Sequence, residues 1–168
     1  KGRNTTGGQI FYRPATLYPG QIGGKVDLPA SGRNSARAGI YQDFYHRATG
    51  AHFLFTSVHL SNGDGSGGSD QRRVQTQTLM AGLKAVNAGR LPLVIGGDMN
   101  SNHARKYVYD APRQVFQANG FSEVFDRAST RVRANINSFN SLNKTPATGG
   151  YRVDQIYVSG DVSVSHAE

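Results

Sequence analysis

The sequence contains no cysteine. That absence excludes disulfide bonds, thiol catalysis and cysteine-ligated zinc, and it leaves the redox compartment open. No apolar run approaches the ~20 residues that a transmembrane helix needs, so we expect no membrane span. Hydrophobic residues make up 37% of the chain, which is below the usual range for globular proteins. Glycine, by contrast, occurs 21 times, which is typical of a loop-rich chain rather than a helical bundle.

Acidic residues are also scarce, with 11 against 19 basic ones and a net charge of +8. A basic surface favours a polyanionic partner such as nucleic acid, an anionic lipid head group or another phosphate ester. The plainer interpretation is that the charge serves solubility. Arginine carries most of the excess, and it suits bidentate phosphate contacts better than lysine does. Abundant Asn, Ser, Thr, Tyr and Gly with few Lys weakly favours an extracellular protein.

The chain is long enough for one domain with a hydrophobic core. Its composition does not change along the sequence in a way that would mark a second domain, so we expect a single domain over residues 1–168. Hairpins and helix crossovers together indicate α/β layers. The hydrophobic pattern predicts helices over residues 70–88 and 107–118. It predicts strands over residues 9–13, 25–28, 39–47, 51–60, 91–96, 151–158 and 161–164. The polar residues 61–69 are expected to form a flexible loop, either a simple linker or a mobile rim of a site.

Residues 93–100 carry the strongest functional signal. An apolar strand ends there in two glycines, followed by Asp98, Met99 and Asn100. Because side chains alternate along a strand, Asp98 and Asn100 point the same way. A carboxylate beside an amide suits a hard cation or a phosphate oxygen. The same residues also form ordinary turns, and this stretch alone leaves the two interpretations about even.

Two further strand patterns contain polar residues of the same kind. His59 lies near the end of the pattern over residues 53–60, where a structural histidine is the commoner case. Asp154 lies within an apolar alternation over residues 151–158. An acid in that setting is harder to dismiss, because burying an unpaired carboxylate is costly.

The ordered set of these motifs resembles the endonuclease/exonuclease/phosphatase superfamily, which has the fold of pancreatic deoxyribonuclease. The resemblance covers nearly the whole chain. It rests on residues 12–14, 35–38, 59–60, 72–75, 97–100 and 152–156. It implies a four-layer α/β/β/α sandwich of the deoxyribonuclease I-like type, with two sheets face to face and helices outside.

Two parts of the superfamily pattern are missing. Its opening Asn strand and Glu motif, which supplies the principal metal ligand, do not occur, and neither does its closing Ser-Asp-His motif. His166 does not fit that last motif and is expected to be a strand side chain. We therefore expect a partial domain, incomplete at both ends, which missing segments or a partner chain would complete. The 168 residues alone are expected to be inactive.

The resemblance also implies roles for five residues. Asp98 would orient or deprotonate the attacking water and help to bind metal. Asn100 would hold a phosphate oxygen or the metal. His59 would contact the scissile phosphate, Asp154 would orient the absent histidine, and Arg37 would contact a neighbouring phosphate. The implied metal is Mg²⁺, with Mn²⁺ or Ca²⁺ as alternatives.

Other polar residues receive weaker predictions. Arg72 and Arg73, at the start of the helix predicted over residues 70–88, are expected to lie on the surface or to anchor a loop. Asn137 and Ser138 belong to a segment that faces the site in the superfamily, so the resemblance allows them to contact substrate.

The sequence therefore predicts a metal-dependent phosphodiesterase, and the positive charge and Arg37 favour a nuclease acting on DNA or RNA. Two alternatives stay open. One is a phosphoesterase acting on a lipid or sugar phosphate. The other is a catalytically silent binding module on the same fold, which the two missing motifs favour.

Overall fold

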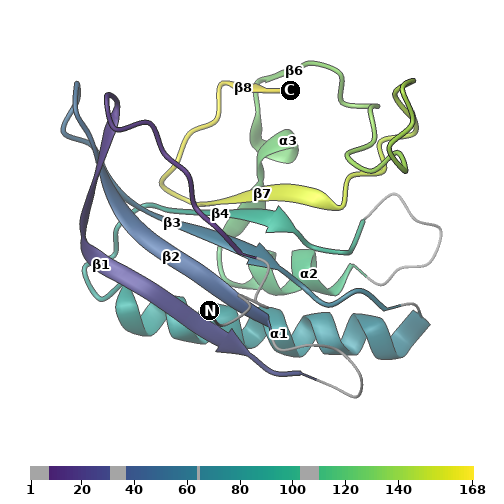
Figure 1. Ribbon diagram of the computed structural model, residues 1–168, viewed down its shortest axis with the longest axis horizontal. Helices are drawn as coiled ribbons and strands as arrows, with labels where there is room; N and C mark the ends of the chain where they lie inside the picture. The colour runs from purple at the N-terminus through teal and green to yellow at the C-terminus, as the bar shows by residue number, and fades with distance from the viewer. Residues whose placement is uncertain (1–7, 31–36, 64, 103–109) are drawn as a thin grey trace, which may run out of the picture.

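The computed structural model describes residues 8–30, 37–63, 65–102 and 110–168 (Figure 1). Within these residues strands dominate, with two longer helices and one short one. In chain order the elements are β1 (Leu17–Leu28), β2 (Arg37–His46), β3 (His52–His59), α1 (Gly65–Val86), β4 (Leu93–Asp98), α2 (Ala111–Ala118), β5 (Phe121–Glu123), α3 (Val124–Arg127), β6 (Thr130–Arg131), β7 (Asp154–Ser159) and β8 (His166–Ala167).

Six of the strands form one sheet in the order β1-β2-β3-β4-β7-β5. Neighbours in this sheet are antiparallel except β3 and β4, which are parallel. A parallel pair needs a long crossover, and α1 provides it between these two strands. The two-residue strands β6 and β8 form a separate parallel pair.

One face of the sheet and the helices enclose the hydrophobic core. Along β3, Leu54, Thr56 and Val58 are buried in alternation, as expected for one face of a strand. Helix α1 contributes Leu79 and Leu83 to the same core. Helix α2 packs Phe116 against Tyr157 of β7, with ring centroids 4.3 Å apart. Figure 1 shows α1 and α2 on the same side of the sheet.

The opposite face of the sheet is only partly covered in the described part of the chain. Ile156 of β7 is 44% exposed there. Helix α3 and the segment leading to β8 lie across from it and enclose a hollow with β7. The expected α/β class with a large sheet is confirmed. Of the four expected layers, the described residues supply helices and one six-stranded sheet, and the only other sheet among them is the short β6–β8 pair.

Two expectations near the start of the chain were wrong. Residues 9–13 form no strand. They lead into a turn in which the amides of Thr16 and Leu17 both donate to the Arg13 carbonyl, each at 2.9 Å. The strand begins only at Leu17 and is much longer than the expected residues 25–28. Pairing along β2 holds its glycine-rich part extended, with an irregularity between Pro19 and Gly23. Tertiary pairing here overrides the low strand propensity of glycine.

Two later expectations also need correction. Helix α1 begins at Gly65 rather than at residue 70, so the polar loop after β3 is much shorter than expected. Residues 161–164 form no strand, since the chain turns after β7 with the Val162 amide donating to the Ser159 carbonyl at 3.0 Å. The second predicted helix begins at Ala111, and residues 107–109 of that prediction lie outside the described residues.

The remaining elements agree with their predictions. The antiparallel hairpin of β2 and β3, the strand leading to Asp98 and the strand carrying Asp154 are all present. His166 lies in β8, as expected of a strand side chain. No helix in the described part of the chain combines the length and the apolar character that a membrane span requires.

Candidate active site

Three of the predicted site residues lie in one row across neighbouring strands. The parallel pairing of β3 and β4 puts His59 opposite Asp98, and the antiparallel pairing of β4 and β7 puts Asp98 opposite Asp154. Residues directly opposite each other share a face of the sheet. Their neighbours Val58 and Gln155 are buried, so the row belongs to the face that points away from the helices.

His59 and Asp98 are close enough to interact directly. His59 Nε2 lies 3.4 Å from Asp98 Oδ2, and each side chain is about one-third exposed, at 35% and 31%. The other carboxylate oxygen of Asp98, Oδ1, accepts a hydrogen bond from the backbone amide of Asn100 at 2.8 Å. Both oxygens of Asp98 are therefore oriented, one toward the histidine and one toward the following turn.

Burial raises the pKa of Asp98 above its ordinary value of 3.8. The Asn100 amide and the charge of His59 oppose this shift, and the negative charge of Asp154 adds to it. Arg37 lowers the pKa of Asp98 by the smallest contribution. His59, Asp154 and Arg37 therefore all act electrostatically on Asp98.

The turn that carries Asn100 is fixed from both sides. Asn100 adopts a left-handed backbone conformation with φ of 46°. Its side-chain Nδ2 donates to the Leu60 carbonyl at 2.9 Å, and the Leu60 amide donates to the Asp98 carbonyl at 2.9 Å. On the other side, the Met99 amide donates to the Val153 carbonyl at 2.8 Å. In this orientation the amide oxygen is the group that Asn100 can offer to a cation.

Gly97 allows β3 and β4 to meet at the site. Its φ is 150°, and a Cβ at this position would lie 1.8 Å from the Val58 carbonyl oxygen. No side chain fits at that distance from backbone. The close approach holds the ends of the two strands together, and those ends carry His59 and Asp98.

Asp154 begins β7 and is exposed. The amides of Val153 and Asp154 both donate to Ser138 Oγ at 3.0 Å, and the Tyr151 amide donates to Asn137 Oδ1 at 2.8 Å. Asn137 and Ser138 were expected as possible substrate contacts. Their oxygens hold the start of β7, a role that the sequence did not signal, and substrate contact by these residues stays a prediction.

The two helix arginines are engaged within the protein. Arg72 is buried, and its Nη1 donates to the Ser61 and Gly63 carbonyls at 3.3 and 2.9 Å. It is therefore a loop anchor, one of the two roles expected. Arg73 Nη2 donates to Gln114 Oε1 at 2.8 Å and links α1 to α2.

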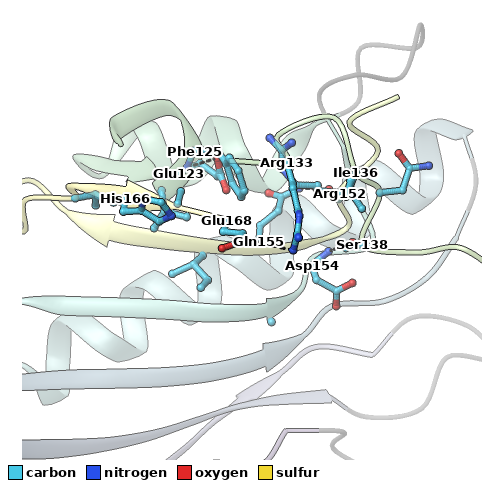
Figure 2. A pocket seen from close by; sticks show the side chains of 16 residues that line it. Glu123, Phe125, Arg133, Ile136, Ser138, Arg152, Asp154, Gln155, His166 and Glu168 are labelled. Atoms are coloured by element: carbon cyan, nitrogen blue, oxygen red, sulfur yellow. Dashed lines mark hydrogen bonds and ion pairs between the residues drawn. The ribbon is translucent and has the colours of Figure 1, made fainter. Parts of the chain in front are cut away.

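A hollow of about 700 Å³ lies beside Asp154, over the exposed face of β7. Figure 2 shows Asp154 near one end of it and His166 and Glu123 toward the other. The Arg152 guanidinium stacks over the Phe125 ring at 4.2 Å. Burial raises the pKa of Glu123, and Arg152 opposes that shift. Sequence reasoning did not single out Glu123 or Phe125, because neither belongs to a motif.

The metal-binding prediction concerns Asp98 and Asn100. Among the described residues, no three His, Cys, Asp or Glu side chains lie close enough to form a metal site. The carboxylate of Asp98 and the amide oxygen of Asn100 are hard donors of the kind that Mg²⁺ accepts. These two residues fit part of a magnesium site.

No protein-family model matches the sequence, and no curated protein sequence matches it. Solved structures do match. The chain superposes on a mannosyl-6-phosphatase from Bacteroides thetaiotaomicron with a TM-score of 0.69 and 22% identity, over 92% of this chain and 57% of that one. An endonuclease/exonuclease/phosphatase protein from Bacteroides vulgatus gives a TM-score of 0.74 at 19% identity, over 92% and 59%.

The chain has the fold of the endonuclease/exonuclease/phosphatase proteins. The human Nocturnin catalytic domain with bound sulfate is a more distant match, with a TM-score of 0.59 and 17% identity over 87% of this chain and 49% of that one. The deoxyribonuclease I-like fold inferred from the motifs is thereby confirmed. The chain spans 49–59% of the length of these three structures.

We expect Gly97→Ala to destabilise the protein strongly, by at least about 2 kcal/mol, because the new methyl group meets backbone and the residue has a positive φ. The control is Gly67→Ala in α1, where a Cβ meets nothing within 4 Å. That change is expected to be neutral or to stabilise by up to about 1 kcal/mol. Urea unfolding measures both, and equal stability of the two variants would contradict the close approach.

The raised pKa of Asp98 leads to a second prediction. An acid whose pKa is higher in the folded state than in the unfolded state destabilises the fold wherever it is ionised. Asp98→Asn is therefore expected to raise the free energy of unfolding at pH 7. The gain should shrink as pH falls through the folded pKa and vanish below the ordinary value of 3.8. Urea unfolding as a function of pH gives the comparison, and a gain that does not depend on pH would contradict the prediction.

Proposed function

We propose that this chain carries part of the active site of a metal-dependent phosphodiesterase, and that the substrate is nucleic acid. The observation that carries the proposal is the row of His59, Asp98 and Asp154 across three adjacent strands. The fold is one found in phosphate-ester hydrolases, which supports the reaction class. The row supplies two carboxylates and an imidazole, and both His59 and Asp154 act electrostatically on Asp98.

Each residue of the row has a distinct role in this proposal. Asp98 orients the attacking water and accepts its proton, and a raised pKa brings a carboxylate closer to the range in which it acts as a base. His59 stabilises the charge that develops on the phosphate. Asp154 orients a further group of the site. These are general requirements of phosphoryl hydrolysis, in which positioned charges supply most of the rate enhancement.

The metal in this proposal is Mg²⁺, with Mn²⁺ or Ca²⁺ as alternatives. Asp98 and the amide oxygen of Asn100 hold it. When bound, such an ion polarises the phosphate and lowers the pKa of a bound water. The bond between Asn100 Nδ2 and the Leu60 carbonyl fixes the orientation of the side chain and leaves its amide oxygen available to a cation.

The preference for nucleic acid rests on charge. The chain carries a net charge of +8, and Arg37 lies close enough to Asp98 to lower its pKa. A sugar phosphate is the second candidate, since one structural neighbour is named a mannosyl-6-phosphatase and a hollow of about 700 Å³ lies beside Asp154. An extracellular location, completion of the fold by further segments or a partner chain, and inactivity of the 168 residues alone stay predictions.

Asp98→Ala or His59→Ala in the complete protein is expected to lower kcat by at least ~10²-fold, the scale for losing one positioned catalytic group. Magnesium-dependent plasmid nicking and hydrolysis of bis(p-nitrophenyl) phosphate give the rates, with chelator as a blank. His46→Ala is the matched control, because the only side-chain partner of this histidine among the described residues is Thr49, at the turn that follows β2. Near-normal rates in well-folded Asp98 and His59 variants would refute the assignment.

Arg37→Ala is expected to weaken DNA binding more than it slows the chemical step. An arginine that neutralises one phosphate contributes roughly one unit to the slope of log affinity against log salt. Salt titrations should therefore show a shallower slope for this variant. Arg47→Ala serves as the control, since Arg47 lies just beyond the opposite end of β2 and donates to the Pro14 carbonyl. Equal slopes for the wild type and the Arg37 variant would exclude a phosphate contact.

A further inference from the structure

Gln75 is a fully buried polar residue on the core-facing side of α1. We propose that it is a positioning residue for the catalytic row, acting through Ser61 and Leu60 on His59 and Asn100. The inference rests on the proposed function, because it assumes that His59 and Asn100 act on the substrate. The Gln75 side chain does not itself reach the site and would act on it only through the residues that it holds.

The amide group of Gln75 has its hydrogen-bonding groups committed to two loops. Its Oε1 accepts from the Ser61 amide at 2.9 Å. Its Nε2 donates to Ser61 Oγ at 2.8 Å and to the Pro29 carbonyl at 3.0 Å. A primary amide has two donor hydrogens, and both have an acceptor here. Gln75 therefore joins the chain after β3 to the chain after β1.

Ser61 is held by α1 at each of its polar groups. Gln75 bonds its amide and its hydroxyl, and Arg72, one turn earlier on the helix, donates to its carbonyl at 3.3 Å. Ser61 is only 1% exposed. The loop after β3 was predicted to be a linker or a mobile rim, but its first residue is fixed to the helix.

Leu60 carries this constraint to the site. It lies between His59 and Ser61, its amide donates to the Asp98 carbonyl, and its carbonyl accepts from Asn100 Nδ2. A short series of bonds thus runs from Gln75 through Ser61 and Leu60 to the turn that carries Asn100. If Ser61 moves, the backbone of His59 and the acceptor of Asn100 move with it.

Packing alone does not explain a glutamine at this position. Leu79 and Leu83 follow Gln75 on the same face of α1 at intervals of four residues, and both are fully buried. A leucine would continue that stripe without a polar group to satisfy. A buried amide stabilises a fold only when all its partners are in place, and its loss leaves those partners unpaired. Here the Ser61 amide and hydroxyl would lose their partner, whereas the Pro29 carbonyl would keep its bond from Gln71.

The experiment replaces Gln75 with methionine, which keeps the length of the side chain and removes its hydrogen bonds. In the complete protein, Gln75→Met is expected to lower kcat for bis(p-nitrophenyl) phosphate with Mg²⁺ by at least ~10-fold. KM should change by less than about threefold, because a misplaced catalytic group slows the chemical step rather than binding. Rates are taken at a temperature where circular dichroism shows both proteins folded.

Gln71→Met is the matched control. Gln71 lies one turn earlier on α1, and its Nε2 donates to the same Pro29 carbonyl at 2.6 Å, but it has no hydrogen bond to Ser61 among the described residues. This variant is expected to keep wild-type kcat. An equal loss in both variants would assign the effect to the chain after β1 and overturn the proposal.

Ser61→Ala tests the same connection if Gln75→Met does not fold. It removes only the hydroxyl bond and keeps the amide bond, so we expect a smaller fall in kcat with KM unchanged. Adding it to Gln75→Met should cost little more, because residues of one hydrogen-bond network are not additive. Wild-type kcat in Ser61→Ala, or in a folded Gln75→Met, overturns the positioning role when His59→Ala is inactive. An active His59→Ala refutes the proposed function instead.

Discussion

The parallel pairing of β3 with β4 is the constraint on which the candidate site depends. Parallel strands end at the same edge of a sheet, so His59 and Asp98 arrive side by side although nearly forty residues separate them. The 22-residue helix α1 makes this pairing possible, because it returns the chain to the edge of the sheet at which β3 begins. Gly97 lets the strand ends meet, and the antiparallel β7 then adds Asp154 to the same row.

Two features of the site oppose stability. Burial raises the pKa of Asp98, so ionising it costs free energy in the folded state. Asn100 adopts a left-handed conformation, which non-glycine residues seldom do. The surrounding hydrogen bonds from Leu60, Met99 and Gln75 hold this arrangement in place. Strain of this kind is typical of positions where geometry matters more than stability.

Much of the fold and of the site row could be predicted from the sequence. The hairpin, α1 and the strand leading to Asp98 follow from periodicity, and the ordered motifs identify the fold. Strand boundaries in the glycine-rich segment of β1 could not be predicted, because pairing with β2 rather than local propensity keeps that segment extended. The partial covering of the sheet face that points away from the helices likewise depends on contacts between residues that are distant in sequence, such as those of the β6–β8 pair.

The net charge of +8 suggested a protein that binds a polyanionic partner. The structure shows that many of the arginines are already engaged within the chain. Many arginines donate to carbonyls within the chain: Arg47 to Pro14, Arg72 to Ser61 and Gly63, Arg127 to Gly160, Arg131 to Asp126 and Arg152 to Ala134. Guanidinium groups engaged in this way stabilise loops, and they stay charged while doing so. The net charge therefore still attracts a polyanion over distance, but it does not indicate how many arginines would contact a phosphate. Specific recognition has to come from residues beside the row, which makes Arg37 more informative than the total of nineteen basic residues.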